Sequence, residues 1–133
     1  MATFKVFENT TLQFNKEILS NPGTSGKNRS PGDQLLLDRP LLDNNGNQVA
    51  TVQLRGTYIQ VFAGNDPLMS FQASNIFKKG IINTQGTLRF SLFATTRQTF
   101  AIVGGAGRYK KAHGTVTVRE VGPNLLELTY RVS

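Results

Sequence analysis

This sequence of 133 residues contains no cysteine, no tryptophan and a single histidine, His113. The absence of cysteine excludes disulfide bonds, thiolate catalysis and cysteine-bound metals. One histidine cannot build a histidine-rich metal centre. We therefore expect no metal site in this protein.

Charged residues are also scarce, at 17% of the chain, and they form no long block of one sign. The 38% of hydrophobic residues can supply one core, so we expect a single domain over residues 1–133. No apolar run is long enough to cross a bilayer, and the alternating N-terminus lacks the apolar stretch of a signal peptide. We therefore expect a cytoplasmic protein that does not contact membranes.

The net charge of +7 makes a nucleic acid or another polyanion a conceivable partner. A nucleic-acid binder is expected to gather its basic residues on one face, whereas scattered charge is typical of solubility or an oligomer surface. The basic residues here are scattered over loops and strand ends: Lys27, Arg29, Lys78, Lys79, Arg108, Lys110 and Lys111. Polyanion binding is therefore kept only as the weaker alternative.

Most of the chain alternates apolar and polar residues between turn signals, which is typical of β-strands. Segment 15–32 is interpreted as a long loop with at most one helical turn at 16–19. Pro40 indicates an edge position or a bend, and Gly56 a kink or bulge. Eight strands are predicted over residues 3–14, 33–42, 48–62, 68–77, 81–93, 98–103, 113–121 and 125–133.

Eight strands with short connections predict an all-β fold, an eight-stranded antiparallel β-barrel. Closure of the barrel removes exposed strand edges, and an interior of this size can hold one small ligand. A β-sandwich is the alternative that the same pattern permits.

The most distinctive segment is the glycine-rich corner GGAGRYKKAHG at 104–114. It lacks the third glycine and the following helix of a nucleotide-binding loop. It resembles the GGxGxFxxAxG signature shared by dirigent proteins and allene oxide cyclases, with Tyr109 in the aromatic place. Segments 7–10, 32–41 and 45–50 resemble further parts of that family in the same order, so the resemblance covers most of 6–133.

The resemblance implies a barrel with an internal ligand cavity, a homo-oligomer (dimer or trimer) and chemistry without a cofactor. Small bacterial relatives in this family include cyclases that close rings in polyketide natural products. The implied function is a cofactor-independent cyclase or isomerase that directs ring closure of an apolar, polyketide- or oxylipin-like substrate. The alternative is a non-catalytic, dirigent-like binding protein that guides stereoselective coupling.

Two residues are predicted to be catalytic, Glu8 and Arg39. Glu8 lies on the more apolar face of the first segment and matches the first-strand acid of the plant cyclases. A carboxylate on such a face needs a partner, because burial without one is costly. By parity Arg39 shares a face with Leu35 and Leu37, so we expect it to enter the lumen and pair with Glu8. The alternative is an ordinary salt bridge at the rim.

Six further residues are predicted to bind the substrate. Val52, Leu54 and Tyr58 share a face that matches the cavity wall of the cyclases, although packing against a neighbouring subunit is an equal alternative for Tyr58. The other three match polar family positions: Thr10, where the cyclases have Asn; Asp38, the first acid of the dirigent pair; and His113, where the family has Arg or Tyr. His113 suits a proton carrier, with a structural role as its alternative.

Overall fold

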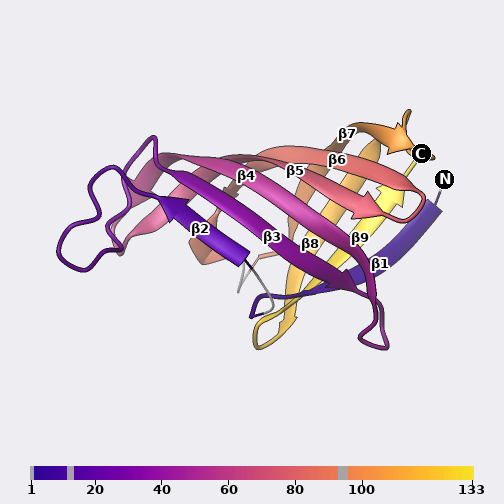
Figure 1. The fold of residues 1–133 in the computed structure, drawn as a ribbon, viewed down its shortest axis with the longest axis horizontal. Coiled ribbons are helices and arrows are strands. Elements are labelled where there is room, and N and C mark those ends of the chain that lie inside the picture. Colours follow the sequence, from indigo (N-terminus) through magenta and orange to yellow (C-terminus); the bar gives the residue numbers. More distant parts are fainter. Residues whose placement is uncertain (1, 12–13, 93–95) are drawn as a thin grey trace.

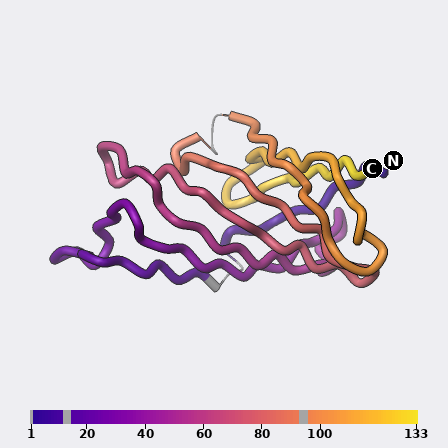
Figure 2. The backbone as a smooth tube through the Cα atoms, turned by 90° about the horizontal axis from the view of Figure 1, so that it is seen from above, coloured from indigo at the N-terminus to yellow at the C-terminus, as the bar shows by residue number. Residues whose placement is uncertain are grey.

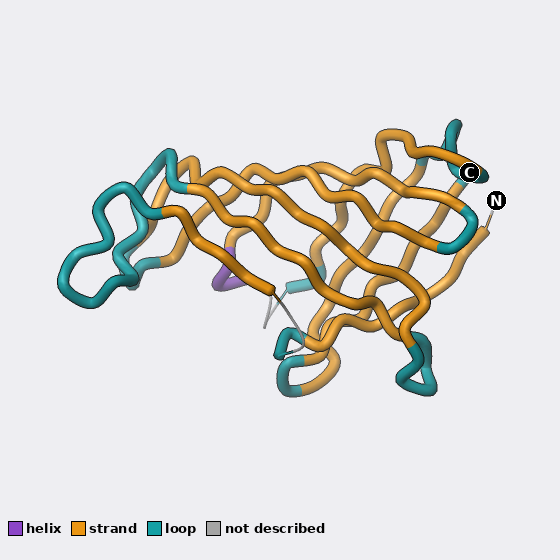
Figure 3. The backbone as a smooth tube through the Cα atoms, viewed as in Figure 1, coloured by secondary structure: helices purple, strands orange, loops and turns teal. Residues whose placement is uncertain are grey.

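The computed structural model describes residues 2–11, 14–92 and 96–133, which fold as a β-barrel (Figures 1 and 3). No helix in this part of the chain is both long and apolar enough to cross a membrane. The elements are β1 Ala2–Asn9, β2 Phe14–Ile18, β3 Gln34–Leu42, β4 Gln48–Phe62, β5 Asp66–Phe77, β6 Gly80–Arg89, the 3-10 helix η1 Phe90–Leu92, β7 Gln98–Gly107, β8 Gly114–Gly122 and β9 Leu125–Val132.

From β3 to β9 every strand pairs antiparallel with the next one, and β9 pairs with β1. The barrel closes where β1 meets β3 again, at the pair Phe7 and Leu42. The early strands (purple to magenta) and the late strands (orange to yellow) therefore lie on opposite sides of the molecule (Figure 2). This confirms the predicted closed barrel of eight antiparallel strands, to which β2 adds a ninth along β3.

Pro40 occupies the edge position that the sequence predicted. One edge of β3 pairs with β4 along its length, with Pro40 opposite Thr51. The other edge pairs with β2 as far as Asp38 and with β1 at Leu42. Because proline has no N–H to donate, it fits the gap between these two partners without losing a ladder hydrogen bond.

The prediction of one strand over 3–14 is wrong, because β1 ends at Asn9. The Asn9 side-chain oxygen accepts hydrogen bonds from the backbone N–H (3.0 Å) and the hydroxyl (2.7 Å) of Thr11, which turns the chain. The chain then re-enters the sheet as β2, where a loop was predicted. Residues 12–13 of that predicted strand, and residue 93 of the predicted strand 81–93, lie outside the described residues.

The structure revises the roles predicted for two glycines, Gly56 and Gly105. Gly56 causes no bulge: it pairs regularly with Leu35 and Phe71, and a Cβ there would lie 2.1 Å from the Met69 sulfur. Glycine here leaves room for the Met69 side chain, which occupies the space that a Cβ would take. Gly105 lies inside β7, which runs past its predicted end, and a Cβ there would lie 1.9 Å from the Ile81 carbonyl oxygen.

The inward-facing alternate residues of the strands form one core. Near the chain termini this core is aromatic: Phe4 stacks on Tyr130 with ring centroids 5.1 Å apart, and Phe77 meets both rings edge-on at 5.6 Å. The termini lie side by side because Ala2 pairs with Val132 (Figure 1). The aromatic cluster therefore packs the end of the barrel beside the chain termini.

Candidate functional site

A cavity of about 350 Å³ lies inside the barrel beyond the aromatic cluster. This volume is at the lower end of the range for small-molecule sites. The wall is mainly apolar because every second residue of each strand points inward. Its apolar lining includes Leu35, Leu37, Val52, Leu54, Met69, Phe71, Phe100, Val116 and Leu126.

The polar lining residues fall into two groups. Thr10, Asn15, Glu120 and Asn124 come from strand ends and turns and are at least partly exposed, so they mark the rim of the cavity. Thr10 is fixed there by its backbone N–H, which donates to the Asn124 carbonyl at 2.9 Å. The second group lies deeper in the wall and includes Glu8, which is buried, and Arg39, which is partly buried.

Glu8 and Arg39 meet inside the cavity, which confirms the pairing predicted from parity. Arg39 Nη1 donates a hydrogen bond to Glu8 Oε2. Only 9% of the Glu8 side chain and 13% of the Arg39 side chain are exposed. The two charges therefore compensate each other in a place with little water, where an uncompensated charge would be strongly unfavourable.

The Nε–H group of Arg39, unlike Nη1, takes no part in the ion pair. The Nε atom is buried and has no hydrogen-bond partner among the described residues. A buried N–H without a partner is rare, because it loses its bond to water and gains nothing in return. An oxygen of a bound molecule would supply the missing acceptor, and Arg39 lines the cavity in which such a molecule would lie.

Asn75 and Thr84 are buried polar residues of the cavity wall that the sequence analysis missed. Asn75 alternates with Phe71 and Ala73 on β5, and Thr84 follows Ile82 on β6, so both lie on inward faces. Both residues could have been found in the sequence, because each is a polar residue among apolar ones on the inward face of its strand. The same pattern identified Glu8.

Tyr58 does not line the cavity, although it lies on the predicted face of β4. It is fully buried farther along the strand, where its hydroxyl donates to Glu17 Oε2 at 2.9 Å. Its ring meets Phe90 edge-on at 5.8 Å. Burial, followed by the hydrogen bond to Glu17, raises the pKa of Tyr58, so this hydroxyl stays protonated. Tyr58 thus lies beyond the cavity and packs against Phe90, which lines it.

Asp38 points away from the cavity, as it must if its neighbour Arg39 points inward. It lines a groove of about 590 Å³ on the outer face of the sheet, with Gln53, Gln72 and Gln85. The Gln53 amide donates to Asp38 Oδ2 at 3.5 Å. The structure therefore separates Asp38 from the other predicted site residues.

His113 is exposed in the connection before β8, where its backbone pairs with that of Ser133, and it does not line the cavity. Thr10, Val52 and Leu54 do line the cavity together with Glu8 and Arg39. No group of three His, Cys, Asp or Glu side chains suited to a metal ion occurs within residues 2–11, 14–92 and 96–133.

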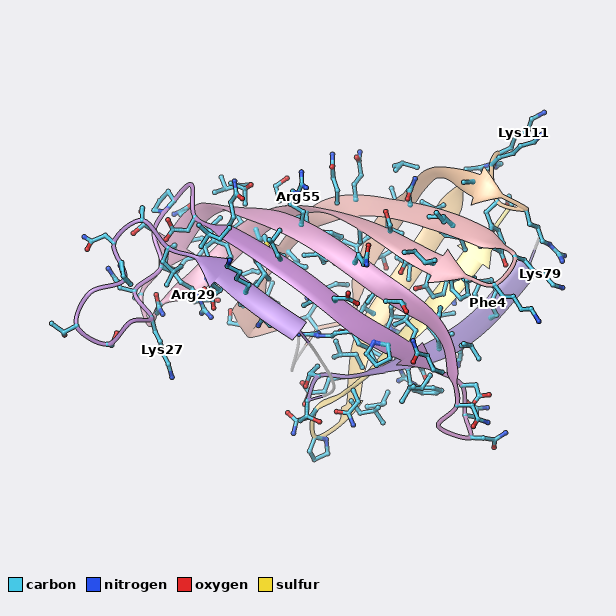
Figure 4. All side chains as sticks on the ribbon, in the orientation of Figure 1. Phe4, Lys27, Arg29, Arg55, Lys79 and Lys111 are labelled. Atoms are coloured by element: carbon cyan, nitrogen blue, oxygen red, sulfur yellow. The ribbon has the colours of Figure 1, made fainter. Side chains whose placement is uncertain are left out.

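Basic side chains lie at both ends of the molecule (Figure 4). Lys27 and Arg29 are at one end, and Lys79 and Lys111 are at the other. Arg29 is engaged with Glu17, since its Nε and Nη2 donate to the two carboxylate oxygens at 2.8 and 2.9 Å. These labelled residues do not form one continuous positive face.

Residues 9–132 match the protein family described as "Allene oxide cyclase barrel like domain". No curated protein is similar in sequence to this chain.

Several solved structures share the fold. A pyocyanin demethylase superposes with a TM-score of 0.76 at 19% identity, covering 99% of this chain and 100% of that one. The Diels–Alderase AbmU from Streptomyces koyangensis superposes with a TM-score of 0.71 at 21% identity, covering 97% of this chain and 63% of that one. A pterocarpan synthase dirigent protein has a TM-score of 0.68 at 17% identity, covering 98% and 83%. At these identities the likeness establishes the fold alone.

Proposed function

Because this chain belongs to the allene oxide cyclase barrel-like family, we propose that it is a cofactor-independent cyclase or isomerase. It encloses a largely apolar, polyketide- or oxylipin-like molecule in its barrel and directs ring closure. The observation on which the proposal rests is the buried Glu8–Arg39 pair on an otherwise apolar cavity wall. Diels–Alderases, which close rings, are among the proteins with the same fold.

The apolar wall would act by shape. A flexible molecule confined among Val52, Leu54 and Phe71 loses most of its conformations, and the reacting atoms are brought together. Orientation of this kind lowers a barrier without any covalent help from the protein. In ring closure the two reacting ends already belong to one molecule, so the barrel has only to hold the bent conformation in which they meet.

The Glu8–Arg39 pair would stabilise charge that develops on the substrate during the reaction. Arg39 Nε would donate to an oxygen of the substrate, and the guanidinium would stabilise negative charge that develops there during the reaction. Glu8, bound to the opposite side of the same guanidinium, holds it in place and supplies a carboxylate for proton transfer.

The alternative function, a non-catalytic dirigent-like protein, is favoured by one observation. Glu8 already accepts a hydrogen bond from Arg39, so its carboxylate is engaged before any substrate enters. In that case the pair only anchors a reactive molecule made elsewhere, and the barrel determines the face on which coupling occurs.

Replacement of Glu8 by Gln separates the two functions. The Gln side chain keeps the shape but cannot take up a proton, so the cyclase proposal predicts a loss of about 100-fold or more in kcat for ring closure of a polyene ketone. Affinity for the same compound, measured by isothermal titration, is expected to change little. Product formation is followed by chromatography.

The matched control is Glu127→Gln, which changes a carboxylate on the outer side of β9, where it pairs with Lys5 and Arg119. This variant is expected to keep both rate and affinity. An unchanged kcat in Glu8→Gln would reject Glu8 as a catalytic group and leave the anchoring function.

We further propose that the molecule works as a homo-oligomer in the cytoplasm and needs no cofactor. Exposed apolar side chains support the homo-oligomer. Several strands carry large ones, among them Ile59, which is 52% exposed, and Val103, which is 51% exposed. Light scattering of the purified protein measures the oligomeric state.

A further inference from the structure

Three buried polar side chains form a second hydrogen-bonded unit next to the cavity. The Tyr130 hydroxyl donates to Asn75 Oδ1 at 2.7 Å. Asn75 Nδ2 donates to the Ile82 carbonyl at 3.0 Å and to Thr84 Oγ1 at 3.3 Å. Tyr130 lies behind the wall, whereas Asn75 and Thr84 line the cavity itself.

The direction of the hydrogen bonds in this unit is fixed. The amide oxygen of Asn75 carries no proton and can only accept, so the proton of this hydrogen bond comes from the Tyr130 hydroxyl. Burial, and after it the charge of Glu8, raises the pKa of Tyr130, which keeps this hydroxyl a donor. Hydrogen bonds that point the same way polarise and strengthen one another.

The last member of the unit, Thr84, has a proton left to donate. Its oxygen accepts from Asn75, and the residue makes no further hydrogen bond within the described part of the chain. Only 4% of Thr84 is exposed, so water outside the barrel does not reach this hydroxyl freely. An acceptor inside the cavity is therefore the partner that the geometry leaves open.

The two donors lie apart on the wall. In the sheet, Arg39 stands opposite Val52, and Val52 stands opposite Asn75, so strand β4, with the apolar Val52 at this level, separates the Glu8–Arg39 pair from the second unit. Thr84 lies on β6, one strand beyond β5, so three strand spacings, about 14 Å along the sheet, separate the strands of Arg39 and Thr84.

We propose that Thr84 is a specificity-determining residue whose hydroxyl binds a second acceptor atom of the ligand, at a distance from the one that Arg39 Nε binds. The proposal rests on the cavity function above and narrows the substrate class. The ligand is an apolar molecule with two hydrogen-bond acceptor oxygens separated by a hydrocarbon frame, such as a diketone. A pure hydrocarbon would leave both buried donors unpartnered and would bind more weakly.

Two rigid tricyclic probes test this inference. Anthraquinone has carbonyl oxygens on opposite edges of its frame, and anthracene has the same frame without acceptors. Their dissociation constants are measured by fluorescence with the native protein, Thr84→Val and Thr84→Ser. Valine keeps the volume of threonine and removes the hydroxyl, whereas serine restores it; the unfolding temperature of each variant without probe checks that the barrel stays folded.

We expect Thr84→Val to weaken anthraquinone binding about three- to tenfold, as for one lost neutral hydrogen bond, and to leave anthracene binding unchanged. Thr84→Ser should restore most of the anthraquinone affinity. Equal affinities of Thr84→Val and the native protein for anthraquinone would overturn the role of Thr84 and leave the proposed function intact. Failure of both probes to bind the native protein would instead contradict the cavity as a ligand site, and this inference with it.

Discussion

Glu8 and Arg39 stand 31 positions apart in the chain. They meet because β1 points its even-numbered residues into the barrel and β3 points its odd-numbered residues inward. Each charge alone would be poorly solvated in this cavity, and together they are compensated. The pair is therefore a structural element as well as a candidate catalytic one, and the two roles can be measured separately.

Replacement of Arg39 by Met is expected to lower the free energy of unfolding by about 3 kcal/mol, because it leaves the Glu8 carboxylate buried without a cation. The double variant Glu8→Gln, Arg39→Met removes both charges and should lose less than the sum of the two single variants. Urea unfolding of the four proteins measures this coupling. Strict additivity would show that the pair contributes nothing beyond its separate residues.

Sequence parity predicts which face a residue lies on but not how far along the strand the cavity extends. Parity placed Glu8 and Arg39 on inward faces, and for Val52 and Leu54 the family resemblance was needed to choose the inward face of their strand. Tyr58 has the correct parity and still lies beyond the cavity, where Phe90 and Glu17 enclose it. Asp38 was predicted from the family resemblance and not from parity. It points outward because the adjacent Arg39 points into the cavity.

At the scale of elements, β2 is the strand that the sequence did not predict. Its five residues, FNKEI, include three polar ones, so local periodicity is weak. Long-range contacts hold it in place: β3 supplies the ladder, and Glu17 of β2 binds both Arg29 and Tyr58. No pattern confined to residues 14–18 could have indicated these partners.

Glu17→Gln tests these contacts through their pH dependence. Hydrogen bonding to Arg29 lowers the pKa of Glu17, against burial, which raises it. Because the folded protein holds this carboxylate ionised, the stabilisation is complete above its ordinary pKa of 4.5 and is lost as the pH falls through the lower folded value. The variant should be less stable than the native protein by about 1 kcal/mol at neutral pH, a small value because the site is partly exposed.

The stability difference between native protein and Glu17→Gln, measured by urea unfolding, should therefore shrink as the pH is lowered below about 4.5. Glu120→Gln, at an exposed carboxylate without an ion pair among the described residues, should show no such trend. A constant difference for Glu17→Gln across this range would contradict the account of β2.

At the scale of the whole molecule, the closed barrel follows from repeated alternation and short turns, and these are visible in the sequence. The closing contact is not visible, since it consists of one β1–β3 pair at Phe7 and Leu42. Its position depends on the register of eight strands added together. The aromatic cluster packs the end of the barrel beside the chain termini, and the cavity lies beyond it, with its rim at Thr10, Glu120 and Asn124.

The central claim is that a small apolar molecule binds inside this barrel, beside Glu8 and Arg39, and not in the groove on its outer face. Methyl NMR of the native protein during titration with naphthalene tests it most directly. The account predicts shifts of the methyl signals of Val52, Val116 and Leu126, which line the cavity, while those of the exposed Val103 and Val121 stay in place. Shifts confined to Val103, which lines the outer groove, would contradict it.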